Sequence, residues 1–130
     1  MLETPLDKLK IEKILYHTGW NIHCLQFHSM APNVSEKFGN DAASQVFRVR
    51  YDSPLARITV SHNRRMIIGI KFTYADQQEQ EMRGSDPNGG NDGPTIDTEF
   101  EVSEGEHLVG ACVETNGIQV RRISFKLMRE

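Results

Sequence analysis

The chain has 130 residues, of which 38% are hydrophobic and 25% charged, and its formal net charge at pH 7 is −3. This size and balance indicate one domain that spans residues 1–130. The net negative charge gives no general attraction to nucleic acid, and no apolar run approaches the about 20 residues that cross a bilayer. The first residues mix acids and bases where a secretory signal needs an apolar stretch. We therefore expect a cytoplasmic protein with no membrane span and no nucleic-acid partner.

The N-terminal segment fits two patterns. Leu6, Leu9 and Lys13 would share one face of a helix, whereas Leu9, Ile11 and Lys13 alternate as in a strand. Pairing with the apolar segment that opens at Ile22 requires an extended chain. We therefore predict a strand from about Leu9.

One short pattern occurs three times along the chain. It consists of a β-branched residue, two residues, an aliphatic residue, one residue and a phenylalanine, and an aliphatic residue stands seven positions before each copy. Residues that favour turns lie between the two parts. The copies are 22–27, 67–72 and 120–125, the preceding aliphatics are Leu15, Val60 and Val113, and the turn residues are Thr18-Gly19, Asn63-Arg64 and Asn116-Gly117.

Each copy predicts a β-hairpin whose second strand places an aliphatic residue and a phenylalanine on one face. The intervals between the copies leave room for two further strands and a loop. We therefore expect an all-β fold of three four-stranded, Greek-key-like units, related by pseudo-threefold symmetry around a common core. A chance match of three short apolar segments is the alternative. The predicted core pairs are Leu25/Phe27, Ile70/Phe72 and Ile123/Phe125.

Other segments complete the outline of the fold. Residues 45–51 and 95–102 alternate and predict further strands, and residues 84–94 form a turn-rich loop. This loop lacks the distal acidic residue of a calcium-binding EF-hand, so no metal site is expected there. Cys24 and Cys112 are too few for a disulfide scaffold, and we predict that both are free and buried.

The second half of the chain resembles the jacalin-related lectins. The similar segments are 55–60, 67–74, the loop 84–93, and 104–109 leading to 123–125. The resemblance implies a β-prism. Residues 10–23 are similar to the hairpin that usually closes the domain in that family, so the resemblance also implies a circular permutation.

The family holds sugar at hairpin tips of the pattern Gly-x-x-x-Asp, beside a glycine-rich loop. In this chain the fifth position is His23, Ile68 or Arg121. Neutral histidine accepts one hydrogen bond, whereas isoleucine and arginine accept none with their side chains. The resemblance therefore implies a weak or non-standard glycan site. The candidate ligand-binding residues are Gly19, Trp20, Asn21, Ile22 and His23 at the first tip, with Gly39, Asn40 and Asp41 from the neighbouring loop.

Two side chains at this tip have alternative interpretations. Trp20 would either stack on a sugar ring or pack against its own hairpin. His17 and His23 are expected on facing strands, where a pair of surface histidines is favoured over a metal site because the sequence gives no third ligand at a fixed spacing.

Two functions are consistent with the tip residues and with the resemblance. The first is a lectin-like module that binds a glycan, and the alternative is a β-prism that has lost sugar binding and serves as a protein-interaction or assembly module. No nucleophile elbow, phosphate loop or zinc-protease motif is present, so neither an enzyme nor a cofactor is expected. The expected partner is a glycan or a protein, with a homo-oligomer as one option.

Overall fold

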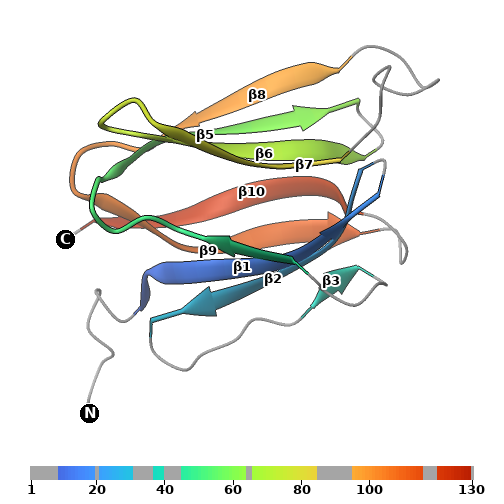
Figure 1. Ribbon diagram of the computed structural model, residues 1–130, viewed down its shortest axis with the longest axis horizontal. Coiled ribbons are helices and arrows are strands. Elements are labelled where there is room, and N and C mark those ends of the chain that lie inside the picture. Colours follow the sequence, from blue (N-terminus) through green and yellow to red (C-terminus); the bar gives the residue numbers. More distant parts are fainter. Residues whose placement is uncertain are drawn as a thin grey trace.

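The computed structural model describes residues 9–19, 21–30, 37–39, 45–63, 66–84, 95–115 and 120–129, and these form ten strands (Figure 1). No helix among them is long and apolar enough to cross a membrane. The strands are β1 (Ile11–Thr18), β2 (Ile22–Ser29), β3 (Phe38–Gly39), β4 (Gln45–Arg48), β5 (Leu55–His62), β6 (Ile67–Tyr74), β7 (Glu79–Arg83), β8 (Ile96–Glu101), β9 (Glu106–Thr115) and β10 (Val120–Arg129).

Two four-stranded antiparallel sheets have the same topology. The first sheet has the order β3-β2-β1-β4 and the second the order β7-β6-β5-β8. In each, three consecutive strands pair in turn and the fourth returns to lie beside the first, which is a Greek key. The predicted strand 95–102 is confirmed as β8, the strand predicted over 45–51 is present as β4 but ends at Arg48, and the strand expected from about Leu9 begins at Ile11.

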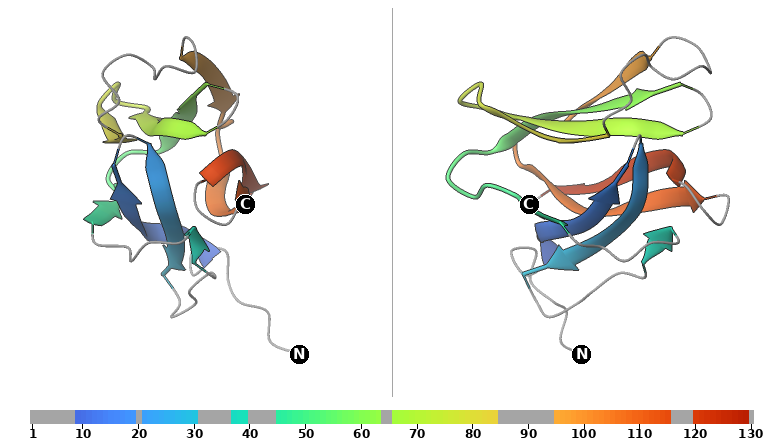
Figure 2. Two further views of the ribbon diagram at one scale, coloured as in Figure 1. Left: turned by 90° about the vertical axis from the view of Figure 1, so that its right-hand side faces the viewer. Right: turned by 45° about the vertical axis from the view of Figure 1, so that its right-hand side comes forward.

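The third sheet differs from the expected four-stranded unit. Among the described residues it contains only the hairpin of β9 and β10. β8, which precedes this hairpin in the chain, pairs with β5 of the second sheet along residues 57–62. Viewed from the end where the hairpins turn, the three sheets surround a common interior as the sides of a prism (Figure 2).

The three hairpins share one irregularity, which confirms that they are copies of one unit. In the first, Thr18 pairs with Ile22 and His17 pairs with Cys24, so His23 is an extra residue on the second strand. The same shift makes Ile68 the extra residue in the second hairpin and Arg121 in the third. The fifth position of each predicted tip is therefore a β-bulge, a feature that redirects a side chain next to the turn.

The core lies where the inner faces of the sheets meet. The residue that opens each copy of the pattern is buried, and so are Leu25, Phe27, Ile70 and Phe72. Aromatic rings join the sheets in edge-to-face contacts, with centroids 5.0 Å apart for Phe47 and Phe72 and 5.3 Å apart for Phe100 and Phe125.

Two predictions about the interior were wrong. Leu25 and Ile70 occupy equivalent positions in the first two hairpins, and their partners across the hairpin are Tyr16 and Val60. The counterpart of Val60 is therefore Tyr16. Leu15 lies one position out of phase and is only half-buried. Cys24 is free and buried as expected, whereas Cys112 is free and exposed. Cys112 stands on β9 between Ala111 and Val113, which pack against the core, so the alternation of side chains along the strand turns its thiol to the outer face of the third sheet.

Candidate functional site

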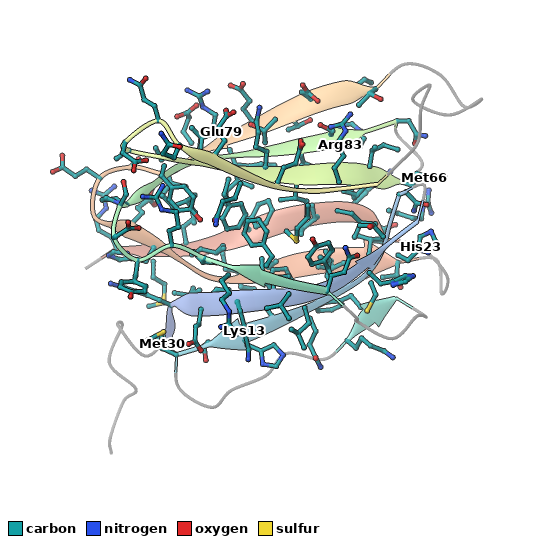
Figure 3. The ribbon with its side chains drawn as sticks, viewed as in Figure 1. Lys13, His23, Met30, Met66, Glu79 and Arg83 are labelled. Carbon is teal, nitrogen blue, oxygen red and sulfur yellow. The ribbon has the colours of Figure 1, made fainter. Side chains whose placement is uncertain are left out.

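The strand ends that border the three hairpin turns lie at one end of the prism (Figure 1). Figure 3 shows His23 of the first hairpin and Met66 of the second at this end, with Met30 at the other. We call it the tip end. The three bulge residues differ in exposure: Ile68 is buried, whereas His23 and Arg121 are half-buried and reach the surface. Only the first and third tips therefore present the side chain of the bulge to a ligand.

The first tip is ordered by a buried asparagine. Asn21 is 2% exposed. Its side-chain Nδ2 donates to the main-chain oxygen of Ile22 at 3.3 Å, and its main-chain oxygen accepts from the amide of Gly19 at 3.0 Å. Its Oδ1 lies 3.0 Å from Nε2 of His23. An amide oxygen only accepts, so Nε2 carries the proton and Nδ1 is the accepting nitrogen of the neutral ring. Asn21 therefore fixes both the orientation and the tautomer of His23.

Two glycines enclose His23 from different sides. A Cβ on Gly19 would come within 2.9 Å of Cε1 of the imidazole, and a Cβ on Gly39 would overlap the carbonyl oxygen of His23. Gly39 also has φ +109°, a conformation that side-chain-bearing residues rarely adopt. β3 pairs with β2 at Gly39 and Cys24, so the loop residue predicted to accompany the tip does lie beside it.

The predicted site residues therefore have different positions. Gly19, His23 and Gly39 converge at the surface, whereas the side chains of Asn21 and Ile22 are buried and leave only their main chains for a ligand. Trp20, Asn40 and Asp41 lie outside the described residues.

His17 lies beside His23 on the facing strand, with ring centroids 5.9 Å apart and planes inclined by 48°. Among the residues that the structure describes, no three His, Cys, Asp or Glu side chains are grouped so as to hold a metal ion. The two rings therefore form a pair at the edge of the first tip.

A pocket that the sequence did not predict lies at the same end, between the second and third sheets. Its volume is about 420 Å³, and it is lined by Val60, His62, Ile67, Thr98, Phe100, Arg121, Arg122 and Ile123. In the sequence, Arg121 stood out only as the residue in the place of the tip aspartate, and no pattern indicated that Arg121 or Arg122 lines a pocket. Their place in a pocket depends on β8 joining the second sheet, which no local pattern specifies.

A second hollow of about 550 Å³ includes residues 48–55 and 106–108. It contains Arg50, which binds Asp52 with N–O distances of 2.9 and 3.1 Å and Asp76 with distances of 2.8 and 3.3 Å. These hydrogen bonds lower the pKa of both carboxyl groups below the ordinary value and raise that of Arg50. The guanidinium also lies 5.0 Å from the centre of the Tyr74 ring. This ion-pair cluster holds the connection between the first and second sheets.

Comparison with known proteins identifies the fold. Residues 35–127 match the model of the Jacalin-like lectin domain, a stretch that excludes the β1–β2 hairpin. A search of curated proteins gives no match.

Solved structures share the architecture at low sequence identity. The chain is similar to the prostate-specific WGA16 glycoprotein lectin, with a TM-score of 0.71, 13% identity, and coverage of 92% of this chain and 83% of that one. It is also similar to the lamprey immune protein, with a TM-score of 0.68, 17% identity, and coverage of 92% of this chain but 37% of that one. For the second β-prism domain of RbmC from V. cholerae the TM-score is 0.62, the identity 19%, and the coverage 94% and 86%.

Proposed function

Because this chain belongs to the Jacalin-like lectin domain family, we propose that it is a carbohydrate-binding module whose glycan site is the first tip, formed by Gly19, His23 and Gly39. A β-prism that has lost sugar binding and acts only in assembly is not favoured, since the family match and a lectin among the similar structures both agree with glycan binding.

The observation that carries the choice of tip is the enclosure of His23 by two glycines. Gly19 faces its ring and Gly39 faces its carbonyl; a Cβ at Gly39 would overlap main chain, and a Cβ at Gly19 would require the imidazole to shift. Glycines at such positions bring main chain close to the surface, where its polar groups can bind sugar hydroxyls. The second tip lacks this arrangement, because its bulge residue Ile68 is buried.

The chemistry of the site differs from that of an aspartate-bearing tip. An ionised carboxylate accepts several hydrogen bonds and strengthens each of them by its charge, whereas a neutral imidazole accepts one. We therefore expect a neutral glycan to bind weakly, and we expect the selectivity to differ from that of family members with Asp at this position.

A glycan array with the purified protein tests the proposal, followed by an NMR titration with the best neutral oligosaccharide. Amide shifts should concentrate at Gly19, His23 and Gly39, and His23→Ala should weaken binding about tenfold, as for the loss of one polar contact and its orientation. Arg121→Ala, which alters the equivalent bulge of the third hairpin, is the matched control and should leave this affinity unchanged. Shifts confined to the opposite end of the prism, or no neutral glycan bound on the array, would reject the site.

A further inference from the structure

The pocket between the second and third sheets has the form of a second ligand site. Its volume of about 420 Å³ falls within the about 300–1,000 Å³ of small-molecule sites. Val60, Ile67, Phe100 and Ile123 supply an apolar surface, while His62 and Thr98 supply polar groups. Nε2 of His62 lies 3.0 Å from Oγ1 of Thr98, so these two side chains are held together beside the pocket.

Both arginines reach this pocket because of the bulge. Adjacent residues on a regular strand point to opposite faces. Here Val120 pairs with Thr115 and Arg122 with Glu114, so Arg121 is the extra residue and the alternation is interrupted. Arg121 and Arg122 consequently line the same pocket, and both approach the same carboxylate, that of Glu114.

The local charge is positive. The guanidinium nitrogens of Arg121 and Arg122 lie 3.9 and 4.0 Å from the two oxygens of Glu114, beyond the range of a direct hydrogen bond. One carboxylate is thus shared by two cations, and no Asp or Glu is among the described residues that line the pocket. The side chain of Arg122 is 72% exposed and can turn its planar group toward an incoming oxyanion.

We propose that this pocket binds an acidic sugar residue, one whose ring carries a carboxylate or a sulfate. Arg121 and Arg122 bind the oxyanion, and the ring lies against the apolar surface that includes Phe100. The inference rests on the proposed carbohydrate-binding function and adds a site distinct from the first tip. It also gives the arginine at the third tip a function in a position where the resemblance predicts an aspartate.

NMR titrations with matched ligands test the charge requirement. The carboxylate probe is methyl glucuronide, with its uncharged methyl ester as control, and the sulfate probe is glucose 6-sulfate, with glucose as control. Each acidic sugar should shift the amides of Val120 to Ile123, and raised salt should weaken its binding. Shifts with only one acidic sugar would identify which oxyanion the pocket takes. Equal binding of the ester and the acid would overturn the proposal, as would equal binding of acetate or inorganic sulfate, because the sugar ring would then contribute nothing.

Charge-neutralising variants test the residues. Arg121→Gln and Arg122→Gln should each weaken binding of the acidic sugar about tenfold or more, as expected for hydrogen bonds to a charged group. Arg129→Gln removes the same charge at the other end of β10 and should have little effect. If Arg129→Gln weakens binding as much as Arg121→Gln, the attraction is a general effect of net charge and the proposal is wrong.

The same titrations separate this inference from the site proposed at the first tip. If neutral glycans shift Gly19, His23 and Gly39 while no acidic sugar shifts Val120 to Ile123, the acidic-sugar site fails alone. If acidic sugars bind at the pocket and no neutral glycan binds at the first tip, the first-tip site fails alone.

Discussion

Replacing Gly39 by alanine should disrupt the contact between β3 and β2 that builds the first tip. The new Cβ would overlap the carbonyl oxygen of His23 and lie 3.0 Å from the Cα of Cys24. Both neighbours are main-chain atoms, so neither can move aside without displacing a strand. The residue would also have to keep φ near +109°.

Gly105→Ala is the matched control for the cost of placing a side-chain-bearing residue at a positive φ. Gly105 has φ +86°, and the nearest atom that a Cβ would meet is Cγ of Arg129 at 3.9 Å, an ordinary contact. We expect this variant to lose about 1–3 kcal/mol of unfolding free energy from backbone strain alone. Gly39→Ala should lose a similar amount plus about 1–3 kcal/mol from the overlap.

The extra loss at Gly39 has an upper limit set by the structure. Among the residues that the structure describes, β3 pairs with β2 at Phe38 and Gly39 alone, so the chain can relieve the overlap by separating this edge strand. In that case the loss of unfolding free energy equals the stability contributed by this pairing and by the contact between the rings of Phe38 and Phe27, whose centroids lie 6.4 Å apart.

Urea denaturation followed by far-UV circular dichroism measures the two free energies, and amide hydrogen exchange measures the opening of β3. Faster exchange of the amides at positions 38 and 39 is expected in Gly39→Ala and not in Gly105→Ala. Equal stability of the two variants, with unchanged exchange in both, would refute the close approach of Gly39 to His23.

Three further predictions follow from burial and charge. Phe72→Ala should cost about 3–5 kcal/mol in urea denaturation, and Phe125→Ala less, because Phe72 is fully buried and Phe125 only partly; an equal cost would contradict the exposed third sheet. In the folded protein a thiol reagent should label Cys112 rapidly and Cys24 only after unfolding, and equal rates would disprove their different burial. Arg50→Gln should raise the lowered pKa values of its two aspartate partners toward 3.8, measured by NMR titration. A carboxyl group whose pKa is lower in the folded than in the unfolded protein stabilises the fold above its unfolded-state pKa, and this contribution is lost as the pH falls through its folded-state pKa. On acidification below about pH 4 the variant should therefore lose less stability than the parent protein does.

Strands with one face against the core were predictable from the sequence, and strands without that pattern were not. β2, β6 and β10 alternate apolar and polar residues because one face meets the core, and their pattern is visible without a structure. β7 buries only Met82 among four polar or charged residues, and β3 has two residues. Neither carries a periodic signal, so both strands were found only in the structure.

The candidate site was predictable in part for a similar reason. The repeat placed His23, Ile68 and Arg121 at one equivalent position, and each proved to be the bulge of its hairpin. Their different exposure was not predictable, because it depends on the neighbouring sheet rather than on the hairpin itself. Ile68 is buried and Arg121 borders a pocket, although both follow the same turn pattern.

By itself, the sequence determined that the chain forms three hairpins, where each of them turns and which face of each second strand meets the core, because two-residue alternation and turn chemistry act between neighbours along the chain. Only the tertiary structure decided that β8 pairs with β5, that Gly39 lies against His23 and that two adjacent arginines share one pocket. These features depend on contacts between segments far apart in sequence. Their geometry is set by the packing of the three sheets around one core, which no local pattern encodes.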